Sequence, residues 1–412
     1  MRVDYLAHRI DYSAPQHVRN AVLSMGRTED VRFSPNNQRL AVAAFRKNKI
    51  SVFEISVTAS DSSKSIAITS ATNISSTYLK SPHGIDFIDD ERIIVANRDG
   101  QVCIFELPPN AIENCELAPV AILKSDSIST PGSVAIIRNE AGLCEALICN
   151  NFANRVTKHL LDLREEDTLS KVLLKKWLDV PDGISLSKER QWIAISNHET
   201  NEVLLYENKP SLNASSAPDG ILRRFNYPHG LRFTSDGNFI LGADAGSPCV
   251  NIYEKGDTDW RGVRDPIRLF RVLNNEDFLR GSYGPGEGGP KGIDVHDAQK
   301  VLVTTCECQP LAFFDLAATL KGACGKREPD PGERLTDNSY HFLTEKWLYK
   351  RKALGVSCQL NLGRSIRAVK HLRAVGHLRA VRAVKRLHNL LKDPNRIKRV
   401  KQKIARRWLP VA

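Results

Sequence analysis

The stretch SPHGIDF at residues 81–87 returns in similar form as YPHGLRF at residues 227–233. Each copy joins Pro-His-Gly to a short run of alternating apolar and polar residues, which is typical of a β-strand. A catalytic motif rarely occurs twice in one chain, so the recurrence indicates a repeated structural unit. In such a unit the proline ends the preceding connection, and the glycine allows neighbouring backbones to approach closely.

Four further segments of the chain align with these two, at intervals of about 50 residues. Each unit contains an alternating strand, a polar turn, an apolar strand, a polar loop and a third strand, and most have a less regular fourth strand. Four strands in a repeat of this length predict the blades of an all-β, six-bladed β-propeller. Six amphipathic helices are excluded because the apolar residues recur at every second position. The equivalent positions are Glu29, His83, Gly132, Asp182, His229 and Lys291.

The last unit lacks an outer strand, because the pattern ends after PLAFFDLAATL at residues 310–320. We expect the N-terminal residues 18–25 to supply that strand beside the one containing Phe313 and Phe314, which closes the ring and removes its exposed sheet edges. The predicted domains are a propeller over residues 1–318, a linker over 319–363 that could include a short helix, and a basic α-helical C-terminal tail over 364–412.

The composition predicts a cytoplasmic protein. No apolar run reaches the roughly 18 to 20 residues needed to cross a bilayer, and charges interrupt the N-terminus where a signal peptide needs an apolar segment. The nine cysteines are odd in number and irregularly spaced, which favours free thiols in a reducing compartment.

The positive charge of the chain is concentrated at its C-terminal end. From Lys346 onward there are 20 Lys and Arg residues and one acid, Asp393, whereas the rest of the chain has 39 basic and 46 acidic residues. We expect two helices, separated near Asp393 and Pro394. For the partner of this tail we rank an anionic membrane surface first, an acidic protein second and nucleic acid third. Membrane association through the tail is therefore compatible with a cytoplasmic location.

The repeats resemble a known group of proteins. VRFSPNNQRLAVAA (31–44), ERIIVANRDGQVCIFEL (91–107) and PHGLRFTSDGNFILGA (228–243) are similar to the YVTN and lactonase-like propellers, a superfamily that includes NHL-type and gluconolactonase-like proteins. The resemblance covers roughly residues 17–318. It implies that the residue before each glycine points into the central channel. Glu29 would then face Asp182 across the axis, and His83 would face His229, with Lys291 in the same ring.

Two carboxylates and two imidazoles at one point could hold one divalent metal ion, such as Zn, Mn, Fe or Ca. Gluconolactonase-like enzymes bind a divalent cation through Glu, Asn and Asp at these positions. Pro181-Asp182-Gly183 matches their Pro-Asp-Gly, and Glu29 matches in type, but Asp30 and Val31 follow it where the family has a small residue and proline. No ring position carries the family's Asn. The polar residues could alternatively line a wet channel that binds nothing.

Two further groups of residues are expected near this mouth. The ends of the second strands should add a polar tier: Asn97, Asn150, Asn197 and Asp244. The insertion at residues 274–289 is glycine-rich and precedes a first strand, so Arg280, Tyr283 and Glu287 could close over a ligand. His159 and His198 are expected in exposed loops or strands.

Two classes of function follow from this ring. The first is a binding or scaffold propeller that holds a small molecule at its axial mouth, with the tail on an anionic surface or partner. The alternative is a metal-assisted hydrolase or lyase acting on a small cyclic ester or a sugar-derived substrate. Fold alone cannot choose between them.

Overall fold

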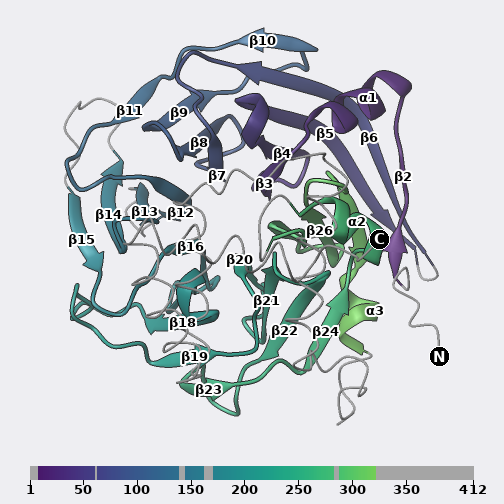
Figure 1. Ribbon diagram of the computed structural model, residues 1–412. Coiled ribbons are helices and arrows are strands. Elements are labelled where there is room, and N and C mark those ends of the chain that lie inside the picture. Colours follow the sequence, from purple (N-terminus) through teal and green to yellow (C-terminus); the bar gives the residue numbers. More distant parts are fainter. Residues whose placement is uncertain (1–7, 61–62, 139–143, 162–169, 283–286, 322–412) are drawn as a thin grey trace, which may run out of the picture. The chain divides into compact units, whose positions relative to one another are not determined.

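The computed structural model describes residues 8–60, 63–138, 144–161, 170–282 and 287–321, and these form six sheets around a common axis (Figure 1). Each sheet is one blade, which confirms the predicted six-bladed β-propeller. The predicted basic tail and nearly all of the predicted linker lie outside the described residues.

The first strand of each blade is the innermost one, and these strands surround the axis: β3 (Thr28–Phe33), β7 (Pro82–Phe87), β12 (Pro131–Arg138), β16 (Pro181–Leu186), β20 (Pro228–Phe233) and β25 (Gly292–His296). The second strands follow in each sheet: β4 (Arg39–Ala44), β8 (Arg92–Asn97), β13 (Cys144–Asn150), β17 (Trp192–Asn197), β21 (Phe239–Asp244) and β26 (Val301–Thr305). The repeated Pro-His-Gly motif therefore begins an innermost strand.

The third strands continue each blade outward: β5 (Lys49–Ala59), β9 (Val102–Glu106), β14 (Arg155–Leu161), β18 (Glu202–Glu207), β22 (Cys249–Glu254) and β27 (Ala312–Asp315). Next to them lie the outer strands: β6 (Lys64–Ser75), β11 (Ala121–Leu123), β15 (Ser170–Leu174), β19 (Gly220–Leu222), β24 (Arg268–Arg271) and β1 (Arg9–Ile10). Three short strands pair with outer strands of the first and fourth blades: β2 (Tyr12–Ser13), β10 (Asn114–Glu116) and β23 (Gly262–Arg264).

The glycine of the innermost strands is required by the next blade. A Cβ added to Gly183 would lie 2.0 Å from the carbonyl oxygen of His229, and one added to Gly84 would lie 2.4 Å from the Cα of Ser133. Both distances are far below contact distance, so no side chain fits there. The expected role of this glycine, a close approach of neighbouring backbones, is confirmed.

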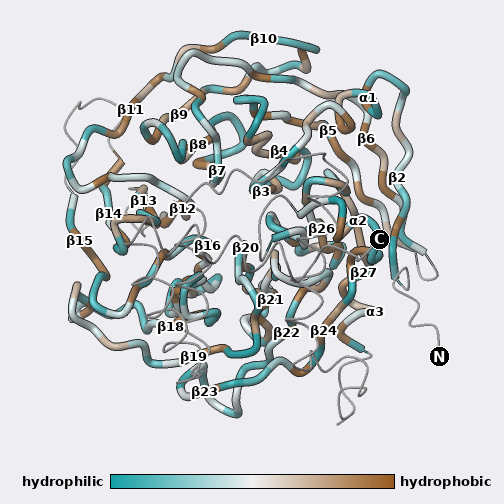
Figure 2. Tube along the Cα trace, viewed as in Figure 1, coloured by the Kyte–Doolittle hydropathy of each residue, from teal (hydrophilic) through white to brown (hydrophobic). Residues whose placement is uncertain are grey.

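The hydrophobic core lies between the blades. Each of six clusters combines apolar side chains from two neighbouring sheets, so the core follows the ring instead of filling its centre. Figure 2 shows hydrophobic stretches along the inner and middle strands of the blades. Burial between sheets stabilises by roughly 25 cal/mol for each Å² removed from water. The axis is left to polar residues.

The N-terminus differs from the prediction. Residues 18–25 do not form a strand, because α1 (Gln16–Ser24) is a helix that begins after Pro15. Val18, Ala21 and Val22 are buried on one helical face, together with Met25, whereas Leu23 is 74% exposed. That spacing has the period of a helix and not of a strand.

The strand that pairs beside Phe313 and Phe314 is β1, in which Arg9 faces Phe314 and Ile10 faces Phe313. β2 then crosses to the first blade and pairs in parallel with β6 through Tyr12 and Ser13.

Polar side chains connect the innermost strands one tier below the mouth. Asp294 Oδ2 accepts a hydrogen bond of 2.6 Å from the backbone N–H of Phe33 in the next blade, and Oδ1 accepts one of 2.6 Å from Arg232 Nε. Asp86 Oδ2 accepts a bond of 2.8 Å from the N–H of Ile136 in the same way. Burial raises the pKa of Asp294 to about 6, against the opposing effect of Arg32.

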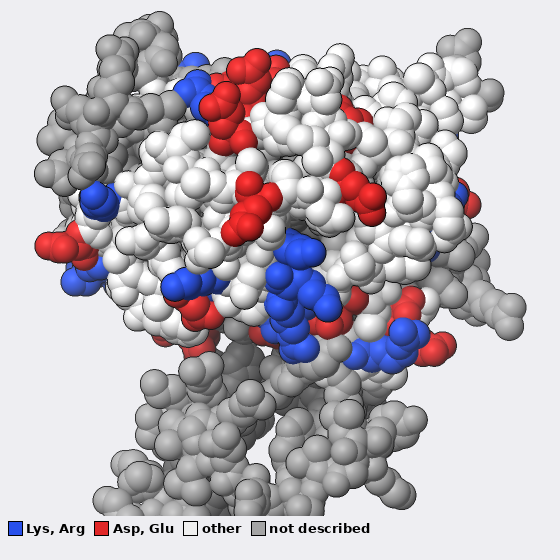
Figure 3. All heavy atoms as spheres, turned by 90° about the horizontal axis from the view of Figure 1, so that it is seen from above, with Lys and Arg blue, Asp and Glu red and all other residues white. Residues whose placement is uncertain are grey.

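Among the described residues, no helix is both long enough and apolar enough to span a membrane. On the face drawn in Figure 3, Asp and Glu side chains form small groups beside Lys and Arg side chains, separated by uncharged surface. The excess of positive charge in the chain therefore comes from the sequence of the tail and not from this face of the propeller.

Candidate metal and ligand site

The structure brings Glu29, His83, Asp182 and His229 together at the axis. The Nε2 atoms of His83 and His229 each lie 3.6 Å from Glu29 Oε2, and the two imidazole rings stack with centroids 5.5 Å apart. The four side chains are at most 5% exposed. Four innermost strands position them, because each residue stands at the same place in its blade.

The hydrogen bonds of the two histidines determine which ring nitrogen carries the proton. His83 Nδ1 lies 2.7 Å from the carbonyl oxygen of Gly132, which can only accept, so Nδ1 is the donor. His229 Nδ1 lies 3.0 Å from Asp182 Oδ2 and donates to that carboxylate. Both Nε2 atoms are therefore acceptors close to Glu29, and that of His83 accepts from Arg98 Nη2 at 2.6 Å. Burial lowers the pKa of His83 to about 4 and that of His229 to about 3, so both rings are neutral at neutral pH.

Glu29 Oε2 is buried and has no hydrogen-bond partner among the described residues. Its other oxygen, Oε1, accepts from Lys291 Nζ at 3.1 Å and from Arg27 Nε. Burial would raise the pKa of Glu29, but Lys291 and Arg27 hold it well below its usual value. The carboxylate is thus ionised, with one oxygen left facing two imidazole Nε2 atoms.

These three acceptor atoms, Glu29 Oε2 and the two Nε2 atoms, fit a divalent metal ion. One ligand atom from each residue lies within 4.8 Å of the other two. Two histidines and one carboxylate form a common donor set for catalytic zinc and for non-haem iron. The Nδ1–H groups are held by Asp182 and by a backbone carbonyl, as the outer hydrogen bonds of metal-binding histidines usually are.

Asp182 has a supporting position. Its Oδ1 accepts from Asn151 Nδ2 at 2.6 Å and from Arg98 Nη2 at 3.2 Å, and its Oδ2 lies 3.3 Å from His198 Nε2. Burial would raise the pKa of Asp182, but the surrounding histidines hold it well below its usual value. Asp182, His198 and His229 form a second group of metal-ligating type. We favour the group with Glu29, since both Asp182 oxygens already have donors beside them.

The ion pairs of the site match three carboxylates with three cations, and Glu307 is a fourth carboxylate near Arg27. Three carboxylates (Glu29, Asp182 and Glu287) face three cations (Arg27, Arg98 and Lys291). Lys291 Nζ lies 2.9 Å from Glu287 Oε2, and Lys291 and Arg27 together hold the pKa of Glu287 at about 2. Lys291 of the predicted ring thus lies beside Glu29, as expected, but its charge is already neutralised.

The expected second polar tier has a different role. The four residues at the ends of the second strands accept hydrogen bonds from the backbone of the loop that leads into the first strand of the same blade. Asn97 Oδ1 accepts from Lys80 N at 3.0 Å, and Asp244 Oδ1 from Tyr227 N at 2.7 Å. In the same way, Asn150 Oδ1 accepts from Ser129 N and Asn197 Oδ1 accepts from Asp179 N. These side chains hold the loops of the mouth.

The side chains that do reach the site follow one residue later, after the strand has ended. Arg98, Asn151 and His198 come directly after Asn97, Asn150 and Asn197. His198 was expected to be exposed and is only 3% exposed, with its ring 5.2 Å from that of His229. His159, also expected to be exposed, is fully buried in β14. The sequence signal that could have identified these residues is a pair of consecutive polar residues at the end of a second strand: Asn-Arg, Asn-Asn or Asn-His.

The insertion at residues 274–289 is partly described. It contains α2 (Asn275–Arg280), where the Arg280 guanidinium lies 3.6 Å from Asp277 and 3.9 Å from Glu276. Tyr283 lies outside the described residues. Glu287 reaches Lys291 and Arg27, so this end of the insertion contributes to the axial cluster.

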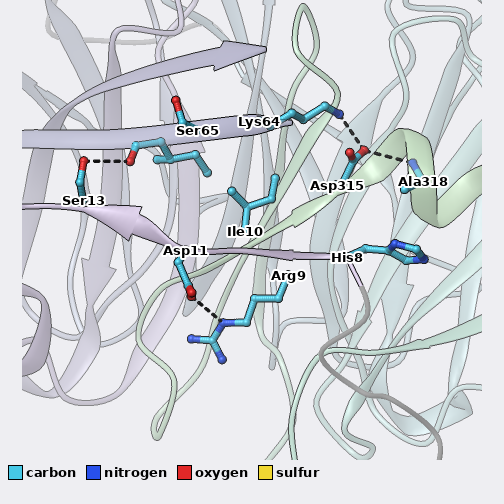
Figure 4. Close-up of a pocket in the computed structure, with 10 residues that line it drawn as sticks. His8, Arg9, Ile10, Asp11, Ser13, Lys64, Ser65, Asp315 and Ala318 are labelled. Atoms are coloured by element: carbon cyan, nitrogen blue, oxygen red, sulfur yellow. Dashed lines mark hydrogen bonds and ion pairs between the residues drawn. The ribbon is translucent and has the colours of Figure 1, made fainter. Parts of the chain in front are cut away.

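A separate hollow of about 430 Å³ lies at the outer edge of the ring, beside β1 and β6 (Figure 4). Lys64 Nζ lies 2.7 Å from Asp315 Oδ1 in it, and Arg9 pairs with Asp11 at 3.8 Å. The axial cluster is the better candidate site, because buried carboxylate and imidazole atoms converge there.

No family model and no curated protein matches this chain. Similar solved structures include a luciferin-regenerating enzyme, with a TM-score of 0.46, 10% identity, and coverage of 68% of this chain and 85% of that one. A gluconolactonase from Xanthomonas campestris has a TM-score of 0.45, 11% identity, and coverage of 70% and 86%. The β-propeller domain of Cps50 (Swd1) from Myceliophteria thermophila has a TM-score of 0.43, 10% identity, and coverage of 70% and 83%.

Proposed function

We propose that this protein is a propeller that binds a divalent metal ion at its axial mouth through Glu29, His83 and His229, and holds a small ligand beside it. The observation that carries the proposal is the buried Glu29 Oε2, which has no hydrogen-bond partner among the described residues and lies 3.6 Å from two imidazole Nε2 atoms. Acceptor atoms that face one another repel unless a cation lies between them, and one of the three, His83 Nε2, accepts from the Arg98 guanidinium in the structure described.

The other residues of the cluster prepare this donor set. Asp182 fixes the orientation and tautomer of His229, and the carbonyl of Gly132 does the same for His83. Lys291 and Arg27 keep Glu29 ionised. The two histidines stay neutral at physiological pH, which is the form that binds metal.

A metal-assisted hydrolase of lactone type is the second candidate, favoured by the same donor set. A divalent ion held by three protein ligands keeps a position open, where it polarises a substrate oxygen or lowers the pKa of a bound water. The crevice beside Lys291, Glu287 and Gly289 has no room for a water-sized molecule. A substrate would therefore have to bind outside this crevice.

Metal content tests the proposal directly. Protein dialysed against Zn²⁺ or Mn²⁺ should retain about one ion per chain in elemental analysis, and the double variant His83→Ala, His229→Ala should retain none. The control is His159→Gln, which changes a buried histidine with a lowered pKa in another part of the third blade. Equal metal content in wild type and the double variant would contradict the site.

Hydrolysis is tested separately with the metal-loaded protein. Ester cleavage of a panel of five- and six-membered sugar lactones should depend on the ion and be lost in the double variant. Stoichiometric metal without any such turnover would leave the binding function and reject the hydrolase.

For the tail, we propose attachment to an anionic membrane surface. The support is its sequence, with 20 Lys and Arg against one acid from Lys346 onward and Trp408 near its end. An acidic protein is the second partner class and nucleic acid the third. Such attachment would place the propeller at the cytoplasmic side of a membrane.

A further inference from the structure

Arg98 occupies the place where the metal ion would bind His83. It follows Asn97 at the end of β8, and its Nη2 lies 2.6 Å from His83 Nε2 and 3.2 Å from Asp182 Oδ1. The guanidinium carbon lies 5.6 Å from the ring centre of Phe152, in a loop of the next blade. The side chain is 18% exposed, and its Nε is buried without a hydrogen-bond partner among the described residues. Arg98 is thus incompletely satisfied where it is.

An imidazole nitrogen has one lone pair, so His83 Nε2 can accept from Arg98 or bind an ion, but not both. A metal–nitrogen bond of about 2.0–2.1 Å would place the ion on the line that the guanidinium now occupies. Arg98 must therefore leave His83 before the ion can bind there. Only Asp182 among its present polar contacts would then remain available to pair with it.

We propose that Arg98 is a displaceable internal cation: it closes the metal site when no ion is bound, and after displacement it binds an anionic group, a carboxylate or a phosphate, at the mouth. This inference rests on the proposed metal site and names the class of ligand that the site takes.

Charge balance is the reason for an anionic ligand. The three ion-paired carboxylates and the three cations of the cluster neutralise one another, and Glu307 is one further carboxylate near Arg27. A divalent ion adds two positive charges in a nearly buried place, and uncompensated buried charge is costly. An anion paired with the released Arg98 offsets this excess. Binding of the ion and of the anion should therefore be coupled, each strengthening the other.

The first test is a competition titration of Zn²⁺ against a chromophoric chelator. Arg98→Gln should bind Zn²⁺ about tenfold more tightly than wild type, since the lone pair of His83 becomes free. Arg27→Gln is the matched control: Arg27 has the same 18% side-chain exposure, pairs with Glu29 and lies 4.9 Å from the Phe45 ring, without a hydrogen bond to His83. Arg27→Gln removes the same charge but leaves the lone pair of His83 occupied by Arg98. It should therefore tighten Zn²⁺ binding clearly less than Arg98→Gln. Equal tightening in both variants, or none in Arg98→Gln, would overturn the inference.

The second test measures the coupling, at constant ionic strength. Acetate or methyl phosphate should tighten Zn²⁺ binding by wild type about fivefold or more, whereas neutral methyl acetate should not. The comparison of the two anions shows whether the site prefers a carboxylate or a phosphate group. Both effects should vanish in Arg98→Gln. No effect of either anion on wild type would overturn the anion role.

The failure of this inference differs from failure of the metal site. If neither wild type nor Arg98→Gln binds Zn²⁺, the proposed metal site is wrong and the inference falls with it. If both bind Zn²⁺ with equal affinity, the metal site stands and the role of Arg98 is overturned.

Discussion

At the scale of single residues, the axis of the propeller has two polar tiers with opposite electrostatics. In the mouth tier, cations and histidines hold the pKa values of Glu29 and Asp182 below normal. One tier below, burial dominates and raises the pKa of Asp294 to about 6. The upper tier is therefore suited to cation binding, and the lower one connects blades.

The lower tier predicts how stability depends on pH. The pKa of Asp294 is higher in the folded state than in the unfolded chain, so its contribution to stability is present below about pH 4 and is lost as pH rises through about 6. Asp294→Asn should therefore gain stability relative to wild type by about 1–3 kcal/mol between pH 4 and pH 7, as measured by urea unfolding.

The control for this prediction is Asp89→Asn, which removes a group shifted in the opposite direction. Burial would raise the pKa of Asp89, but the hydrogen bonds from Arg92 and its neighbours together lower it. The stabilisation by Asp89 is present above its unfolded pKa and is lost at lower pH, so this variant should lose stability relative to wild type as pH rises. The same sign of change in both variants would contradict the assignment.

At the scale of elements, the innermost strands combine two tasks. Three of them approach the next strand closely through a glycine and carry His83, Asp182 or His229 in the position just before it. Packing and site geometry are therefore coupled along the same strand.

Gly183→Ala tests this coupling. The new Cβ would overlap the carbonyl oxygen of His229, so we expect a loss of about 2–3 kcal/mol in unfolding free energy and weaker metal binding, because His229 has to move. The control is Gly100→Ala, whose Cβ would meet only side chains at 3.2 Å and 3.3 Å. Gly183→Ala with wild-type stability and metal affinity would show that the strands can separate without cost.

At the scale of the whole molecule, the first and last blades are joined by the N-terminus. β1 pairs with β27, β2 pairs with β6, and the Tyr12 ring contacts the Phe313 ring edge-on at a centroid distance of 5.8 Å. α1 then buries one face against the same cluster. This connection spans the point where the chain would otherwise leave a sheet edge.

Deletion of residues 1–14 should therefore weaken the ring. Loss of Ile10 and Tyr12 uncovers β27, and we expect a decrease of about 2–4 kcal/mol in stability together with self-association. Thermal unfolding and sedimentation velocity would measure both. Deletion of residues 1–7 alone is the control, and an equal effect of the two deletions would contradict the role of β1 and β2.

The tail belongs to the same scale. The full chain should co-sediment with anionic vesicles and much less with neutral ones, and a chain ending at Trp347 should bind neither. Added salt should weaken the binding, because it is electrostatic. Equally low binding by both chains would reject the membrane partner, and release of the full chain by RNA at constant salt would favour nucleic acid instead.

The sequence by itself determined the number of blades and the position of the axial ring. A period-two strand pattern repeated every 50 residues or so, with glycine after four of the six ring positions, requires stacked sheets with close inner strands. Glu29, His83, Asp182 and His229 were identified because each stands at the same point of its repeat. The spacing of Val18, Ala21 and Val22 also indicates a helix. A strand was predicted there instead, because the last blade needed an outer strand.

Only the tertiary structure decided which atoms meet. Arg98, Asn151 and His198 lie beyond the ends of regular strands, where period-two alternation no longer determines the direction of a side chain. Their approach to Asp182 and His83 depends on the angle between neighbouring blades, which no single repeat encodes. The same holds for the division of roles between Glu29 and Asp182. One is neutralised by cations that leave an oxygen open, and the other is enclosed by donors, because their neighbours come from different blades.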